Sequence, residues 1–460
     1  MSARGPRLRR AVGRAAIDLT PLKVSRPFRN VFAARTLSVF GLGFALVALP
    51  LQVYGLTGSS AMVALVNAVN GASVLGGTLV AGVLADRRPR RGLIVTGRLA
   101  ATAAFTGLAL GALWLDGTAA LAAIVLCAAV NGFLGTFSQV ALQAAVPGLL
   151  PRDRLPAAGA LLALTGKLGS VVAPAAGGAL IALLGYPLVY GITAAASAVT
   201  TLMVARLPAM APEPAPATGV GAGTGGAPGG GAEAVSGTAP SPLGAIAEGL
   251  RFAVRDRVVG PILLLGFVQL LFATPYVLIP ELTDRVLGGG EQTAGLLYSA
   301  SAAGAVAASL TSGWTAHLRR AGAVLAAAVA LCGAAAAGLG ASTALAAAVA
   351  ALVALGFAEI IEEILRFALL QSHTPDRLRG RVNSVWTAQN TVGGSLGGVV
   401  LGALAAAVGP GAAVLAGGAA TAVLTAAIAG IFPGLRRAHP AGAGAPPPGT
   451  PPEPEKEKAA

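Results

Sequence analysis

Apolar residues run along this chain in stretches of about twenty residues or more, separated by short polar or basic segments. A helix of that length crosses a bilayer, because each residue advances a helix by about 1.5 Å and the hydrocarbon core is about 30 Å thick. Glycine and alanine are frequent inside these stretches, and membrane helices pack through such small residues. The pattern predicts an all-α integral membrane protein with twelve transmembrane helices, at residues 31–54, 60–84, 93–115, 118–142, 157–184, 187–205, 259–282, 292–315, 321–340, 343–370, 380–408 and 411–433.

The twelve predicted helices form two sets of six. Residues 207–242 consist mainly of Pro, Gly, Ala, Ser and Thr without a period, which is typical of a flexible linker. Apolar residues then recur at helical spacing over 243–257, and this predicts an amphipathic helix on the membrane surface. The expected order is a basic tail (1–30), a six-helix bundle (31–206), the linker, the surface helix, a second bundle (258–435) and a Pro-rich tail (436–460).

The two halves resemble each other in sequence. Pro-Arg-Asp-Arg-Leu at 151–155 comes at the start of the fifth predicted helix, and Pro-Asp-Arg-Leu at 375–378 comes before the eleventh. Parallel similarity between two six-helix halves is typical of secondary transporters, which rock two bundles about a central site.

Basic residues concentrate in the two tails and in the even-numbered connections between helices. The odd-numbered connections carry a single basic residue, Arg285. Because positively charged loops stay on the cytoplasmic side, we expect both termini in the cytoplasm and an even number of crossings. The formal net charge of +14 then fits the inner surface of a cell membrane, and we expect no nucleic-acid partner.

Composition excludes most other classes of protein. The 460 residues are 55% hydrophobic and 11% charged, with a mean hydropathy of +0.76, a balance outside the range of soluble domains. The two cysteines, Cys127 and Cys332, lie in apolar stretches, and no Cys/His metal spacing is present. We find no catalytic constellation and no phosphate-binding glycine motif, so we expect neither an enzyme nor a cofactor. An ion gradient remains as the energy source.

The loop after the second predicted helix carries a motif. It reads GVLADRRPRR and contains Gly82, Asp86, Arg87, Arg90 and Arg91. It resembles the loop between the second and third helices of the major facilitator superfamily, with proline where that pattern has its second glycine. The resemblance implies a gating role for these five residues. An ordinary positively charged loop is the alternative.

The tenth predicted helix is unusually rich in ionisable residues, which are expensive inside a membrane and so mark functional candidates. Glu359, Glu362 and Glu363 lie at i, i+3 and i+4 and are expected to share a face, with Arg366 in pairing reach. Close carboxylates do not all ionise cheaply, so at least one is expected to carry a proton. The cluster either couples a proton gradient to transport or only holds the helix in register as an ion pair.

Other polar residues within the predicted helices are candidates for the substrate cavity. Arg35 and Lys167 could attract an anionic substrate or extend to the membrane surface. The uncharged candidates either face the cavity or hydrogen-bond neighbouring helices, and the one aromatic candidate either stacks on a ligand or packs. These are Asn131, Gln139, Trp386, Gln389 and Asn390.

Several stretches over residues 18–435 resemble the enterobactin exporter branch of the same superfamily, above all Trp-Thr-Ala-Gln-Asn at 386–390. The resemblance implies two six-helix bundles in the inner membrane and proton-driven export of an apo-siderophore. We expect a monomer whose partners are a small-molecule substrate, protons and the lipid bilayer. Multidrug or antibiotic efflux is the alternative within the superfamily. A transporter-like membrane sensor or scaffold is the alternative from a different class.

Overall fold

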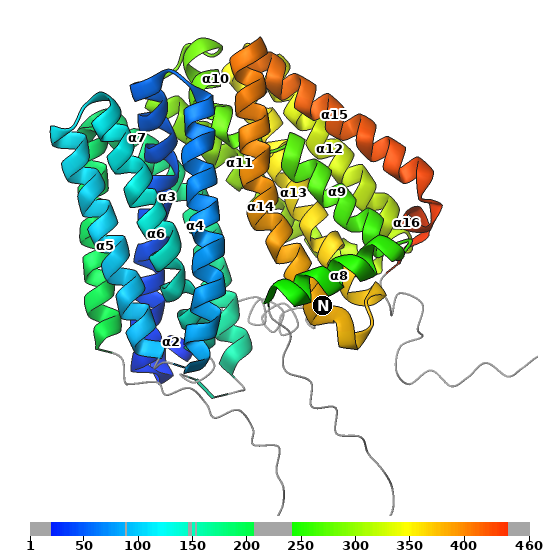
Figure 1. Ribbon diagram of the computed structural model, residues 1–460, viewed down its shortest axis with the longest axis horizontal. Helices are drawn as coiled ribbons and strands as arrows, with labels where there is room; N and C mark the ends of the chain where they lie inside the picture. Colours follow the sequence, from blue (N-terminus) through cyan, green and yellow to red (C-terminus); the bar gives the residue numbers. More distant parts are fainter. Residues whose placement is uncertain (1–19, 88–89, 146–149, 152–153, 207–241, 440–460) are drawn as a thin grey trace, which may run out of the picture.

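The computed structural model describes residues 20–87, 90–145, 150–151, 154–206 and 242–439, and within these ranges the secondary structure is entirely helical. The helices form two bundles that lie side by side (Figure 1), one built from the first half of the chain and one from the second.

The N-terminal bundle begins with a short helix, α2 (Thr20–Val24), which lies at one end of it. Its long helices are α3 (Arg26–Thr57), α4 (Ser60–Arg87), α5 (Arg90–Trp114), α6 (Gly117–Ala145) and α7 (Leu155–Ala205). Helix α3 starts at Arg26, five residues before the start that hydropathy predicts, with the Ser25 side chain accepting a hydrogen bond from the Phe28 backbone N–H.

Helix α7 crosses the bundle twice. Its 51 residues would form a rod of about 76 Å, far longer than a bilayer is thick. Gly185 interrupts it with φ +73° and ψ 170°, a conformation that glycine adopts without steric cost. Ala158 packs with Phe28 near the start of α3, and the carbonyl of Ala205 accepts a hydrogen bond from Arg91 near the start of α5. Both ends of α7 therefore lie at the same end of the bundle, with the turn at the other.

Eleven helices within the described residues are long and apolar enough to cross a membrane. That count takes α7 once, and its two legs correspond to the predicted helices at 157–184 and 187–205. The membrane faces are apolar: large side chains on several helices are more than half exposed, among them Leu46, Leu126, Leu183, Leu310 and Val423. Such broad apolar exposure suits lipid as solvent.

The C-terminal bundle follows a surface helix, α8 (Pro242–Arg255), whose apolar Leu250 and Val254 are exposed. Its transmembrane elements are α9 (Val259–Phe272), η3 (Pro275–Leu278), α10 (Ile279–Arg285), α11 (Glu291–Thr311), η4 (Ser312–His317), α12 (Ala321–Ala341), α13 (Leu345–His373), α14 (Asp376–Val408) and α15 (Pro410–Ile431). A short α16 (Pro433–Arg437) ends the described chain.

The seventh transmembrane segment is broken, whereas hydropathy predicts one continuous helix over 259–282. Helix α9 ends at Phe272, Thr274 leaves the helical region with φ −117° and ψ 74°, and a short 3-10 turn begins at Pro275. Proline disfavours helical geometry in the residue before it and removes a backbone donor, so the break lies where the sequence requires it.

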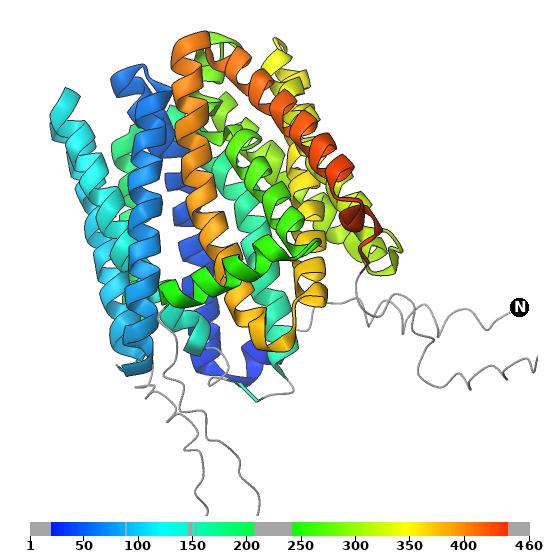
Figure 2. The same cartoon turned by 45° about the vertical axis from the view of Figure 1, so that its right-hand side comes forward.

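The two bundles share a core at one end only. One cluster of buried apolar residues there joins α3, α4, α5 and α7 to η3, α11, α13 and α14. Across the same junction the Tyr54 hydroxyl donates to Asp284 Oδ2 at 3.2 Å. The other buried clusters belong to one half or the other, and α4 and α14 diverge toward the opposite end in Figures 1 and 2. The contacts between the halves thus close one end of the molecule.

Candidate functional site

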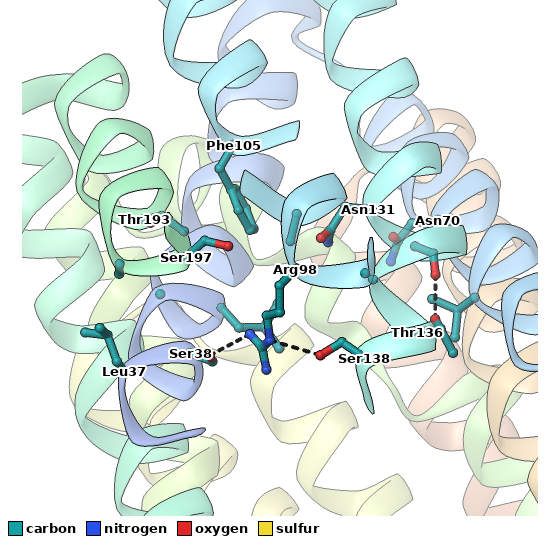
Figure 3. A pocket seen from close by; sticks show the side chains of 18 residues that line it. Leu37, Ser38, Asn70, Arg98, Phe105, Asn131, Thr136, Ser138, Thr193 and Ser197 are labelled. Atoms are coloured by element: carbon teal, nitrogen blue, oxygen red, sulfur yellow. Dashed lines mark hydrogen bonds between the residues drawn. The ribbon is translucent and has the colours of Figure 1, made fainter. Parts of the chain in front are cut away.

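A cavity of about 360 Å³ lies inside the N-terminal bundle, lined by residues of α3, α4, α5, α6 and α7 (Figure 3). A second cavity of about 150 Å³ shares Leu42, Asn70, Phe105 and Asn131 with the first. The second cavity also reaches Tyr276 and Tyr298 of the C-terminal bundle. The two cavities are therefore contiguous, and they connect the interior of one half to the broken segment of the other.

Arg98 of α5 is the charged side chain lining these cavities among the described residues. Its Nε donates to Ser138 Oγ at 3.0 Å, and its Nη1 donates to Ser38 Oγ at 2.6 Å. Figure 3 shows the guanidinium held between these two hydroxyls, one from α6 and one from α3. Ser38 Oγ in turn donates to the Ala34 carbonyl at 2.7 Å, which orients its lone pairs toward the arginine.

The sequence before Arg98 makes this geometry possible. A Cβ at Gly97 would lie 2.7 Å from the Leu134 carbonyl oxygen and from the Ser138 backbone nitrogen. Only a residue without a side chain lets α5 approach α6 this closely, and the approach brings Ser138 within reach of the guanidinium. Hydropathy analysis passes over Arg98 because one arginine does not interrupt an apolar stretch. The rule that intramembrane charges mark function would have found it.

The other cavity candidates on the N-terminal half have different outcomes. Asn131 lines both cavities, as expected for a substrate-facing residue. Arg35 lies one turn before Ser38 on α3, close enough to Arg98 for the two cations to repel each other. The side chains of Lys167 and Gln139 lie outside the described part of the structure.

Glu359 of α13 faces the broken segment. Its Oε2 accepts a hydrogen bond from the Tyr276 hydroxyl at 2.7 Å, and its Oε1 lies 3.5 Å from Gln269 Nε2. The same Tyr276 hydroxyl lies 2.8 Å from Ser301 Oγ on α11. Tyr276 also lines the second cavity, so this one side chain connects Glu359 to the space between the halves.

Glu362 and Arg366 form a closed ion pair. Glu362 Oε1 lies 3.0 Å from Arg366 Nε, and the two side chains are 2% and 4% exposed. A further donor, Arg366 Nη2, reaches Asn390 Oδ1 at 3.3 Å. The guanidinium packs directly over Gly266 of α9, where any Cβ would overlap it. This part of the predicted cluster holds α9, α13 and α14 together.

The expectation that the three glutamates share a face is wrong for Glu363, which is exposed while Glu362 is buried. Spacings of i+3 and i+4 place side chains on adjacent rows of a helix. In the folded structure the row with Glu362 is buried against Arg366, whereas the neighbouring row with Glu363 is exposed.

Two further candidates on α14 serve as helix contacts. Gln389 Nε2 donates to the Leu263 carbonyl at 2.6 Å. Trp386 packs against Phe367 with ring centroids 5.4 Å apart, away from the two cavities. Together with Asn390, these residues contact α9 and α13, as the packing alternative in the sequence analysis predicts; a role in the substrate cavity stays a prediction.

The loop motif is described only in part. The Arg91 guanidinium donates to the Ala205 carbonyl and so ties the start of α5 to the end of α7. Gly82, Asp86, Arg87 and Arg90 lie in the helices that flank the loop, and their surroundings are outside what the structure describes. No group of three or more His, Cys, Asp or Glu within the described ranges is arranged to hold a metal ion.

The family model of the Major Facilitator Superfamily matches this chain over residues 31–398 and over 270–458. The chain belongs to this superfamily. It is therefore a multi-pass membrane transporter and not an enzyme, and its two bundles are the two halves of the superfamily fold.

Individual relatives make the resemblance to enterobactin exporters specific, and that sequence prediction is confirmed. The chain is 34% identical over 402 residues to the enterobactin exporter EntS of Escherichia coli O139:H28 (strain E24377A / ETEC), covering 87% of this chain and 91% of the relative. The EntS protein of Escherichia fergusonii matches with the same identity and coverage.

Solved transporter structures share the fold at low identity. A variant of the nucleoside transporter NupG superposes with a TM-score of 0.69 at 13% identity, covering 88% of this chain and all of that one. A peptide transporter POT in complex with sulfate gives a TM-score of 0.66 at 15% identity, covering 90% and 95%.

Proposed function

We propose that this transporter exports a siderophore from the cytoplasm in exchange for protons. The observation that carries the proposal is the 34% identity to enterobactin exporters over 87% of the chain. A match over 402 of the 460 residues must extend into both halves of the chain. The contiguous cavities, with Arg98 and several amide and hydroxyl groups in their walls, suit a polar organic cargo.

Transport proceeds by alternating access, with the two bundles rocking about the cavities. The distribution of basic residues supports cytoplasmic termini. With that orientation, the shared core and the Tyr54–Asp284 contact close the extracellular side. The loop with Gly82, Asp86, Arg87, Arg90 and Arg91 acts as the cytoplasmic gate. One chain contains both bundles and the cavities, which supports a monomer.

Glu359 is the coupling carboxylate in this scheme. It differs from Glu362 in having neutral partners, Tyr276 and Gln269, and no cation within the ion-pair distance among the described residues. A carboxylate without a counter-ion in a low-dielectric site gains most from binding a proton. Tyr276 lies between it and the cavity and can transmit the change to the cargo space.

The test is siderophore secretion by the source organism with and without the gene. Under iron limitation, a deletion strain should retain siderophore in the cell and secrete less, and the wild-type gene on a plasmid should restore secretion. Unchanged secretion would overturn the proposal. If susceptibility to antibiotics changed while siderophore secretion stayed normal, multidrug or antibiotic efflux would replace siderophore export as the proposed function.

A further inference from the structure

Three segments that are far apart in the sequence meet at one corner of the C-terminal bundle, at the end away from the shared core. They are the turn after α8 (255–258), the start of α12 (318–322) and the region around α16 (432–439). The Gly322 backbone N–H donates to the Ala438 carbonyl at 3.1 Å, and a Cβ at Gly434 would lie 3.7 Å from the Arg257 carbonyl oxygen. These two backbone contacts hold the segments together, and Figure 1 shows the end of α8 and α16 at the same corner.

The contacts gather six arginines, named here the arginine corner: Arg255, Arg257, Arg319, Arg320, Arg436 and Arg437. All six are exposed, and no ion pair or side-chain hydrogen bond joins any of them to another described residue. Asp256 is the one acidic residue in the three segments, and its Oδ1 accepts from the backbone N–H groups of Val258 and Val259 at 2.8 and 2.7 Å. That carboxylate faces the start of α9, and one negative charge does not balance six positive ones.

Exposed apolar side chains lie beside this charge. Val254 of α8 is 76% exposed and directly precedes Arg255, and Ile431 at the end of α15 is 70% exposed. The arginine corner thus combines guanidinium groups with apolar surface at the ends of membrane-spanning helices. A phospholipid presents the matching pair, phosphate above acyl chains, and arginine binds phosphate oxygens through parallel N–H donors. A soluble polyanion matches the charge but not the apolar residues.

We propose that the arginine corner binds the headgroup of an anionic phospholipid in the cytoplasmic leaflet, and that a headgroup with two phosphates fits it best. Because the six cations come from three segments, two linked phosphates contact more than one segment at once. Bound there, the headgroup links the end of α8 to the ends of α12 and α15 and offsets the repulsion between the arginines. This lipid site does not depend on the cavities or on the identity of the cargo.

Native mass spectrometry of the full-length protein in a neutral detergent tests the site with three lipids that carry oleoyl chains. They are zwitterionic phosphatidylcholine, phosphatidylglycerol with one phosphate and a net negative charge, and diphosphatidylglycerol with two phosphates. We expect diphosphatidylglycerol to bind at least about tenfold more tightly than phosphatidylcholine, with phosphatidylglycerol between them. Equal binding of the three lipids would overturn the proposal.

Variants separate the charges from the larger number of acyl chains in diphosphatidylglycerol. Arg320→Gln combined with Arg437→Gln should weaken diphosphatidylglycerol binding by about tenfold and leave phosphatidylcholine binding unchanged. Replacing the same two residues by lysine keeps the charge without the parallel donors, so that variant should fall between, and it tests the site if the glutamine variant does not fold.

The matched control is Arg29→Gln combined with Arg206→Gln, which removes two exposed arginines at the same end of the N-terminal bundle. The control should bind diphosphatidylglycerol within about twofold of the wild type, because screening confines each arginine's attraction to its surroundings. An equal loss in the control and in the Arg320/Arg437 variant would show that binding follows net charge alone, and the proposal would fail.

Inorganic pyrophosphate distinguishes a lipid from a soluble ligand of the same chemistry. It carries two linked phosphates without acyl chains, so it should bind at least about tenfold more weakly than diphosphatidylglycerol. If pyrophosphate bound as tightly as the lipid and lost affinity in the Arg320/Arg437 variant, the arginine corner would serve a soluble diphosphate, and the lipid proposal would be wrong.

Discussion

Arg98 and Arg366 are both arginines within transmembrane helices, one in each half of the molecule, and they differ in whether a carboxylate pairs with them. Arg366 is 3% exposed, is paired with Glu362 and Asn390, and lies over a glycine that leaves it no free space. Arg98 faces a cavity, is held by two neutral hydroxyls and lies near another cation. One charge is paired with a carboxylate, and the other has no Asp or Glu among the described residues that line its cavity.

The difference shows why intramembrane charge alone does not identify a binding site. A charge in lipid must be neutralised by something, and a partner from the same chain makes it a structural element. A charge that the chain leaves without a counter-ion is neutralised by something that arrives and leaves. On this reasoning the cargo site belongs to the N-terminal half and the helix anchor to the C-terminal half, with Glu359 between them at the broken segment.

The largest expected effect is the loss of protein stability when the Glu362–Arg366 ion pair is broken. Arg366→Gln leaves Glu362 buried without its cation and should lower the free energy of unfolding by about 3–5 kcal/mol. Detergent-induced unfolding of the purified protein measures this. The double variant with Glu362→Gln removes both charges and should recover most of the loss. A single variant as stable as the wild type would show that the pair does not hold the helices.

A smaller effect is expected from crowding the same arginine. Gly266→Ala places a methyl group where the Arg366 guanidinium lies, and the displacement should cost about 1–3 kcal/mol. Gly338→Ala on α12 is the control, because its Cβ would meet no atom within 4 Å. Equal stability of the two variants in the same unfolding assay would contradict the tight packing of Arg366.

The smallest effect on stability is expected from replacing Arg98, which faces the cavity. Arg98→Gln loses its hydrogen bonds to Ser38 and Ser138 but also removes repulsion from Arg35, so the net change should stay within about 1 kcal/mol. The unfolding assay should therefore separate Arg98→Gln clearly from Arg366→Gln. A loss at Arg98 as large as that at Arg366 would mean that Arg98 is structural and the comparison is wrong.

The sequence predicts the transmembrane helices well because bilayer thickness sets their length, and the fold follows from their number and the linker. The break at Thr274 is marked by Pro275, a signal that a hydropathy window averages away. Helical spacing does not encode which helices pack against each other. It therefore could not predict that Glu362 is buried and Glu363 exposed, or that Arg366 packs over Gly266. Arg98 was missed because one arginine does not interrupt an apolar stretch, although its charge within a helix marks it as a candidate; its serine partners could not be predicted from the sequence.

The central claim is a division of labour, in which Arg98 holds the cargo and Glu359 carries the proton. Proteoliposomes test it by comparing siderophore uptake driven by an imposed pH difference with siderophore exchange at equal pH. Arg98→Gln should reduce both by about tenfold, and Glu359→Gln should keep exchange while losing uptake driven by the pH difference. Uptake by Glu359→Gln that still followed the pH difference would contradict the account.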